Sequence, residues 1–136
     1  MPIHPERARQ PAISALLSVR GGAAAIKFYK VAFGATEHSR IVDPSGAVVA
    51  KLSIGHAEFW LADEAVEYDN FSPESLGGST VRLILTVEDP DAVFDQAISA
   101  GATAVSQVTD QSYGWRIGRL TDPFGHSWEI GKPLTE

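Results

Sequence analysis

Two oppositely charged side chains stand on predicted strands of this chain, where apolar and polar residues alternate. The sequence around Arg82 reads VRLILTV, and that around Glu129 reads SWEI. Successive side chains of a strand point to opposite faces of its sheet, so both charges are predicted to point away from the core, into a cleft. There they would form an ion pair or bind a charged ligand. Two alternatives without a role in binding stay open: a structural ion pair, and two separately solvated side chains.

Aromatic side chains are the second set of candidates for binding. Tyr113 and Trp115 lie in the segment 107–116, whose glycine would let it move as a lid, and Trp60 lies in EFWLAD. Flat rings bind planar or cationic molecules by stacking and cation–π contact, at about 0.5–2 kcal/mol each. We therefore expect these three rings, and that of Phe71, at the rim of the cleft. The alternatives are a core position for Trp60, and a barrel end or dimer contact for Tyr113 and Trp115.

No nucleophile with a neighbouring base is evident in the sequence. The chain has no cysteine, which excludes thiol nucleophiles and cysteine-ligated metals. Ser14 has no histidine near it in sequence. His38, His56 and His126 are predicted to be ordinary strand or turn residues, and Arg116 and Arg119 to be surface charges that pair with an acidic linker.

The strands that carry these candidate residues belong to an internal sequence repeat. The segment VRGGAAAIKFYKVAFGAT at 19–36 is similar to VEDPDAVFDQAISAGAT at 87–103, and their glycines, Gly34 and Gly101, lie about half a chain length apart. Two copies of one unit that cannot bury its own apolar face imply a pseudo-twofold protein with a shared interior.

Each half is predicted to be βαβββ, which makes the fold α+β. The repeat unit is bounded by turn signals: Asp89 and Pro90 open the second helix, and a glycine closes each helix. One domain is expected, with module one at about 11–64, a linker at 65–79 and module two at about 80–132. Residues 1–10 are expected to form a loose tail. The predicted strands are 12–19, 36–42, 47–54, 58–62, 80–87, 103–108, 115–121 and 127–130, and the first helix is 23–33.

The composition of the chain disfavours two classes of partner, nucleic acids and membranes. The formal net charge of −6 disfavours nucleic acid, because an acidic surface repels phosphate backbones. No apolar run approaches the roughly 20 residues of a membrane span, and no signal peptide is evident. With the lack of cysteine, these features favour a cytoplasmic protein with no membrane partner.

Three motifs carry a resemblance to a known family: AAIKFYKVAFGA at 24–35, VEDPDAVFDQAISAGA at 87–102 and GRLTDPFGHSWEI at 118–130. With them the chain resembles the glyoxalase/bleomycin-resistance/dioxygenase superfamily, the vicinal oxygen chelate fold, and is most similar to its PhnB-like branch. The resemblance implies paired βαβββ modules with a ligand in the cleft between them, and a homodimer. The family's functions include isomerases, dioxygenases, thiol transferases and antibiotic-sequestering proteins, so fold alone does not fix function.

The resemblance also implies four positions for metal ligands, and most are filled here by residues that cannot coordinate. They fall at Ser14, at Arg82, at Trp60 or Ala62, and at Glu129. Serine is a weak neutral donor and arginine has no lone pair to give, so only Glu129 is competent. The expectation is that no metal and no cofactor is bound.

The function predicted from these features is metal-independent binding or sequestration of a small planar or cationic molecule in the inter-module cleft. The predicted ligand-binding residues are Ser14, Trp60, Arg82, Tyr113, Trp115 and Glu129. The first alternative is a divalent-metal-dependent lyase, isomerase or dioxygenase with an altered ligand set that includes Glu129. The second is a non-catalytic homodimer whose cleft is filled by its own side chains.

Overall fold

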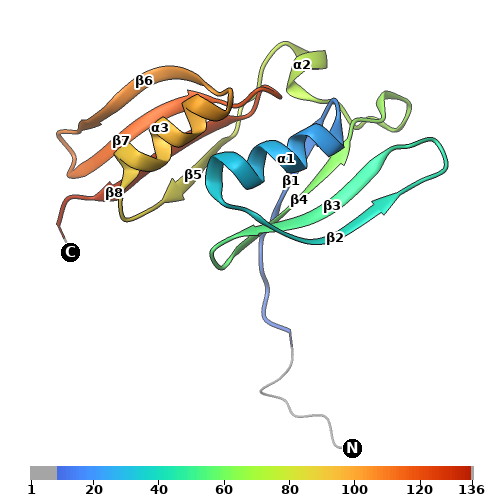
Figure 1. Cartoon of the computed structure of the whole chain (residues 1–136), viewed down its shortest axis with the longest axis horizontal. Coiled ribbons are helices and arrows are strands. Elements are labelled where there is room, and N and C mark those ends of the chain that lie inside the picture. Colours follow the sequence, from blue (N-terminus) through green and yellow to red (C-terminus); the bar gives the residue numbers. More distant parts are fainter. Residues whose placement is uncertain (1–8, 136) are drawn as a thin grey trace, which may run out of the picture.

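The structure is a computed structural model that describes residues 9–135, so most of the predicted tail lies outside the described residues. Its elements follow the predicted βαβββ order twice (Figure 1). Module one consists of β1 (Ala15–Val19), α1 (Gly22–Phe33), β2 (Thr36–Val42), β3 (Val48–Ile54) and β4 (Ala57–Asp63). Module two consists of β5 (Arg82–Thr86), α3 (Pro90–Ala100), β6 (Thr103–Asp110), β7 (Trp115–Thr121) and β8 (Ser127–Pro133).

The strands form two four-stranded sheets with the same topology. Sheet one has the order β1-β4-β3-β2 and sheet two the order β5-β8-β7-β6. In each, the first and last strands of the module pair in parallel and the other neighbours pair antiparallel. The predicted α+β fold of two similar modules is therefore confirmed.

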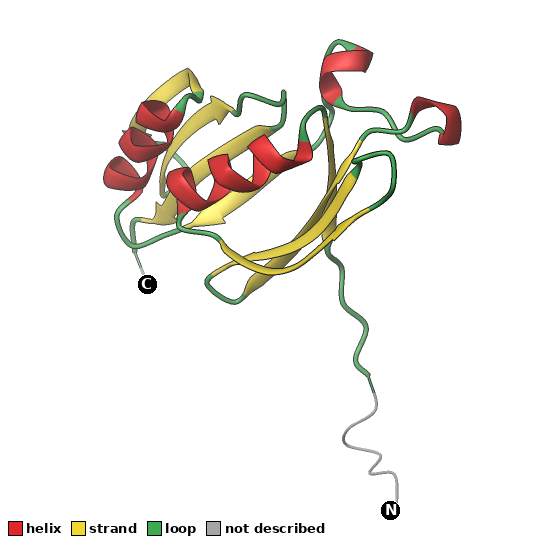
Figure 2. Ribbon diagram, turned by 45° about the vertical axis from the view of Figure 1, so that its right-hand side comes forward, coloured by secondary structure: helices red, strands yellow, loops and turns green. Residues whose placement is uncertain are grey.

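One helix covers one face of each sheet, and the two helices pack against each other between the modules (Figure 2). Helix α1 ends as predicted at Gly34, whose φ of 68° is a left-handed conformation that glycine adopts without a Cβ penalty. Ile26, Tyr29 and Phe33 recur at helical spacing, which predicts one apolar face. That face is buried, with Ile26 and Tyr29 almost inaccessible to solvent. Between the helices, Gln96 donates a hydrogen bond of 2.7 Å from Nε2 to the carbonyl oxygen of Val31.

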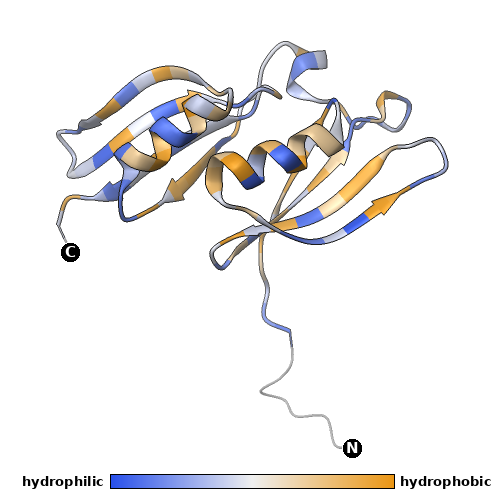
Figure 3. Cartoon of the chain, in the orientation of Figure 1, coloured by the Kyte–Doolittle hydropathy of each residue, from blue (hydrophilic) through white to orange (hydrophobic). Residues whose placement is uncertain are grey.

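The other face of each sheet is not covered by α1 or α3, and we call it the open face. Along β1, Leu17 and Val19 are buried under α1, whereas Leu16 points to the open face and is 54% exposed. Hydrophobic and hydrophilic residues are interspersed along β6 and β7 without strict alternation (Figure 3). The predicted strand 12–19 would bury Ile13 under the helix, but Ile13 is fully exposed, because β1 begins only at Ala15.

The linker contains two short elements that the sequence analysis did not predict, a 3-10 helix at Val66–Tyr68 and α2 at Pro73–Leu76. Glu64 fixes this segment to module one. Its carboxylate accepts hydrogen bonds from the backbone N–H of Ser72, the hydroxyl of Ser75 and the guanidinium of Arg20. The Ser72 N–H is the largest cause of a lowered pKa of Glu64, about 2.

A buried carboxylate joins the two modules. Asp122, in the turn between β7 and β8, is only 3% exposed. Its Oδ2 accepts hydrogen bonds from the Tyr29 hydroxyl of α1 and from Trp128 Nε1 at 2.9 Å. Its Oδ1 accepts from the backbone N–H groups of Phe124 and His126. These four donors compensate the cost of burying the charge.

We predict that Tyr29→Phe lowers the free energy of unfolding by about 1–3 kcal/mol, because the buried carboxylate loses one donor. Urea denaturation of both proteins at neutral pH measures this. The matched control is Tyr68→Phe, since Tyr68 is exposed and should leave stability unchanged. Equal stability of Tyr29→Phe and wild type would contradict the role assigned to this contact.

The same contact should give wild type an alkaline stability loss that Tyr29→Phe lacks. Burial, followed by the negative charge and hydrogen bond of Asp122, raises the pKa of Tyr29 well above 10.0. Above about pH 10 the unfolded phenol releases its proton while the folded one keeps it. The free energy of unfolding should therefore fall with rising pH in that range.

Candidate functional site

A pocket of about 220 Å³ lies on the open face of sheet two. Residues of three neighbouring strands and the β6–β7 turn line it, so we call it the sheet-two pocket: Ile84, Tyr113, Trp115, Ile117 and Glu129. Three of the six predicted ligand-binding residues thus meet in one place. Its lining is mostly apolar, with the Glu129 carboxylate as its one charged group.

The two rings of the sheet-two pocket are placed by a tight hairpin turn. Strand β6 runs to Asp110, and the backbone N–H of Gln111 donates to the carbonyl oxygen of Trp115 at 2.6 Å. Gly114 has a φ of 91° within this turn, which brings Tyr113 and Trp115 close together. The predicted lid over 107–116 is therefore wrong: most of that segment belongs to two paired strands.

Arg82 and Glu129 form the predicted ion pair. Arg82 Nη1 lies 2.7 Å from Glu129 Oε2, and the two side chains are 49% and 16% exposed. In the register of the parallel strands Glu129 stands beside Ile84, so Arg82 reaches it diagonally from two residue pairs away. The guanidinium therefore lies at the edge of the sheet-two pocket.

The predicted pairing of Arg116 with the acidic linker is wrong. Its guanidinium instead binds Asp91 of α3 at 2.7 Å and Asp110 of β6 at 2.9 Å. Arg116 thereby lowers the pKa of Asp91, and the two carboxylates raise its own pKa. Arg119, unlike Arg116, forms no ion pair among the described residues: no carboxylate of residues 9–135 lies within 4.0 Å of its guanidinium nitrogens.

The structure does not bring Ser14 or Trp60 to the sheet-two pocket. Ser14 is exposed and precedes β1. Trp60 lies on the open face of sheet one, where the Lys51 ammonium is 5.6 Å from the centroid of its ring. It is 37% exposed, so the alternative of a core position is also wrong. The predicted cleft with all six residues does not form within one chain.

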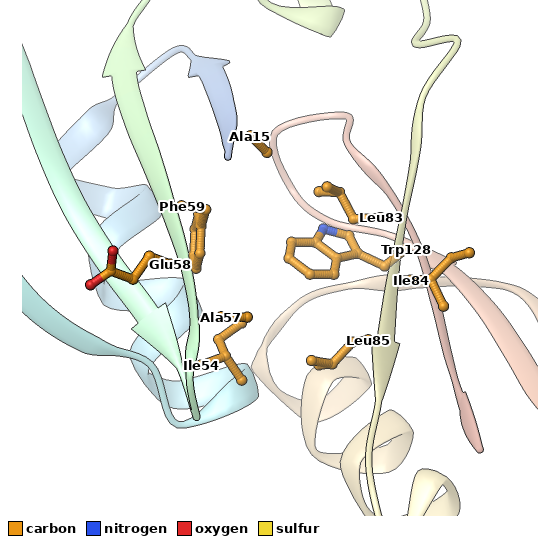
Figure 4. Close-up of a pocket in the computed structure, with 9 residues that line it drawn as sticks. All are labelled: Ala15, Ile54, Ala57, Glu58, Phe59, Leu83, Ile84, Leu85 and Trp128. Atoms are coloured by element: carbon orange, nitrogen blue, oxygen red, sulfur yellow. The ribbon is translucent and has the colours of Figure 1, made fainter. Parts of the chain in front are cut away.

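A second pocket, of about 140 Å³, lies between the modules, where a cleft was predicted, but none of the six predicted ligand-binding residues lines it (Figure 4). Phe59 and Trp128 face each other across it, with ring centroids 6.4 Å apart. Ala15, Ile54, Leu83 and Leu85 complete an apolar lining, and Glu58 directs its carboxylate away from it. The alternation of apolar residues along β4 and β5 was the sequence signal from which this lining could have been predicted. This inter-module pocket offers no polar group to orient a reactant.

The residues of the module junction do not provide a nucleophile and base. His126, predicted to be an ordinary turn residue, donates from Nε2 to the carbonyl oxygen of Ser18 at 2.9 Å. The Ser18 hydroxyl is hydrogen-bonded to Asn70 instead. His38 also has a side-chain partner, since its Nε2 lies 2.7 Å from the hydroxyl of Ser53.

The donors at the expected metal positions do not fit a divalent ion. Glu129 is the one carboxylate among them, and it is already bound to a guanidinium cation. Across residues 9–135, no three histidine, aspartate or glutamate side chains are arranged to hold a metal. Divalent ions that prefer oxygen or nitrogen ligands require several such donors.

The chain belongs to the Glyoxalase/Bleomycin resistance protein/Dioxygenase superfamily, whose family model matches residues 13–130. An uncharacterised protein of Mycobacterium bovis is 42% identical over 131 residues, which are 93% of this chain and 86% of that protein. An uncharacterised Arabidopsis thaliana protein is 32% identical over 121 residues, covering 82% and 71% of the two chains. Membership in the PhnB-like branch stays a prediction.

Solved structures agree on the fold. The X-ray structure of an Arabidopsis thaliana gene product has a TM-score of 0.71 at 28% identity, over 91% of this chain and 100% of that one. A glyoxalase/bleomycin resistance protein/dioxygenase family enzyme of Burkholderia phytofirmans has a TM-score of 0.70 at 23% identity, over 89% and 97%. In the described part of this chain, no helix has the length and apolar character needed to cross a membrane.

A double-mutant cycle on Arg82→Met and Glu129→Gln should give a coupling of about 0.5–1 kcal/mol in the free energy of unfolding. The pair is short but partly exposed, so solvent screens most of its attraction. Denaturation of the four proteins at low and high salt measures it, and the coupling should shrink with added salt. A coupling near zero at low salt would mean that the two side chains do not pair in solution.

Proposed function

We propose that this protein binds a small planar molecule in the sheet-two pocket without a metal, as a binding or sequestering member of its superfamily. The observation that carries the proposal is the ion pair between Arg82 and Glu129. It occupies the one competent carboxylate at the expected metal positions and places a fixed cation beside it. The pocket then has binding surface but no Lewis acid.

The size and lining of the sheet-two pocket favour one or two fused rings. A buried cavity of about 150 Å³ holds benzene, and this pocket of about 220 Å³ is open on one side. Stacking against Tyr113 and Trp115 would contribute about 0.5–1.5 kcal/mol for each ring. Binding of a cationic molecule stays a prediction, since Glu129 would have to release Arg82 to reach it.

The alternative function is a lyase, isomerase or dioxygenase that uses a divalent metal bound through Glu129. It requires the carboxylate to leave Arg82 and further ligands to move in. The sequence supports it through the superfamily alone, which includes both enzymes and binding proteins.

We also propose that the protein is a homodimer, in the cytoplasm, with no nucleic acid or membrane partner. The open face of sheet one carries a patch of apolar side chains that the chain itself does not cover: Leu16, Ile41, Val49 and Trp60. In the register of the sheet, Leu16 lies beside Trp60 and Ile41 beside Val49. Lys51 is the direct partner of Trp60 on β3, so the two apolar pairs meet diagonally, through Trp60 and Val49. A second copy would bury this patch.

Replacement of Trp115 by alanine should weaken binding of a neutral bicyclic probe, 2-naphthamide, by about tenfold, because one wall of the sheet-two pocket is removed. Isothermal titration calorimetry measures this affinity. Trp60→Ala is the matched control and should bind like wild type, since Trp60 lies on the other sheet. Loss of binding in the control but not in Trp115→Ala would move the site to sheet one.

Titration of chelator-treated protein with Zn²⁺, Mn²⁺, Fe²⁺ and Ni²⁺ should give no stoichiometric binding, and elemental analysis of untagged protein should agree. The physical reason is that the expected positions contain a single carboxylate, Glu129, which already binds Arg82. One tightly bound equivalent that Glu129→Gln removes would instead favour the metal-dependent alternative.

Light scattering coupled to size exclusion should give twice the chain mass of 14.6 kDa. Substituting Val49→Glu in the apolar patch should shift the protein to monomer, because a charge would be buried at the interface. Glu58→Gln, on the same strand pair but next to Lys51, is the control. A monomer in wild type at all concentrations would contradict this proposal.

A further inference from the structure

The local charge at the sheet-two pocket has the opposite sign to the charge of the whole chain. The chain carries a formal net charge of −6. At the Glu129 end of the pocket, however, the carboxylate has an arginine on each neighbouring strand, Arg82 on β5 and Arg119 on β7. Neither arginine belongs to the lining, but together they outnumber the carboxylate, so a ligand that extends beyond the lining at this end meets an excess of positive charge.

The placement of Arg119 follows from strand register. It is the direct partner of Glu129 across β7 and β8. It also alternates with Ile117 and Trp115 along β7, so all three side chains project to the open face. Two lining residues of the pocket, Trp115 and Ile117, and the charge of Arg119 thus form one row.

Both guanidinium groups retain donors for a ligand. No carboxylate of residues 9–135 lies within ion-pair distance of Arg119. Arg82 uses one nitrogen, Nη1, for Glu129 and is half exposed. Since a guanidinium has five N–H donors in a planar fork, each arginine can donate to an anionic oxygen group in addition.

We infer that the ligand of the sheet-two pocket is a planar aromatic acid. Its ring stacks on Tyr113 and Trp115, and its carboxylate lies against Arg119 and the free edge of Arg82. Bidentate pairing of arginine with a carboxylate is among the strongest polar contacts in proteins. This inference rests on the proposed function, because it names the ligand class of that same site.

Glu129 has a second role under this assignment. By pairing with Nη1 it fixes the Arg82 guanidinium beside the pocket, and it cancels one of the two positive charges. Neutralising Glu129 therefore raises the net positive charge that an acid meets. A cationic ligand would respond in the opposite direction, which makes Glu129→Gln a sensor of ligand charge.

The test compares three probes of equal ring size by isothermal titration calorimetry at low salt: 2-naphthoate, 2-naphthamide and 2-(aminomethyl)naphthalene. Wild type should bind the acid about tenfold more tightly than the amide, and the amine least. Arg119→Gln should weaken the acid about tenfold and leave the amide unchanged. Glu129→Gln should bind the acid at least as tightly as wild type. Lys51→Gln, a cation on sheet one, is the control and should bind like wild type.

The outcomes separate this inference from the proposed function. Tightest binding of the amine or the amide, abolished by Trp115→Ala, would overturn the acid and leave a planar ligand in the pocket. An advantage of the acid that survives in Arg119→Gln would overturn the assignment to this arginine. Failure of all three probes to bind would contradict the proposed function itself.

Discussion

The buried carboxylate of Asp122 is the constraint on which the arrangement of both modules depends. A charge that is 3% exposed needs donors from several directions, and they come from α1, from its own turn and from β8. Tyr29 is the contribution of module one. The contact fixes α1 against the turn that starts β8. The sheet that carries the candidate site is therefore positioned by a residue on its opposite, buried side.

The register of the strands then determines which side chains lie on the open face of sheet two. Trp128 donates to Asp122 and is buried, so the next residue, Glu129, must point the other way. Glu129 then stands between β5 and β7, beside Ile84 and opposite Arg119. Arg82 binds it there, so the one carboxylate at the expected metal positions is held in an ion pair within the chain.

Local signals in the sequence predicted most of the fold. The Asp89 cap, the glycine ends of both helices and the period-two alternation are properties of a few neighbouring residues, and they set the elements correctly. The ion pair was predictable because each partner's face follows from its own strand. What could not be predicted depends on contacts distant in sequence. Examples are the separation of Trp60 from Tyr113, the partners of Arg116, and the linker elements that Glu64 fixes.

The three tryptophans of the chain lie in three different surroundings. Trp128 is in the core and hydrogen-bonded to Asp122, Trp60 is on the open face of sheet one, and Trp115 lines the sheet-two pocket. Indole emission shifts to shorter wavelength as its surroundings become less polar. The natural fluorescence of this protein is therefore a sum of contributions from three different regions. Versions with two tryptophans replaced would give each region its own optical signal without an added dye.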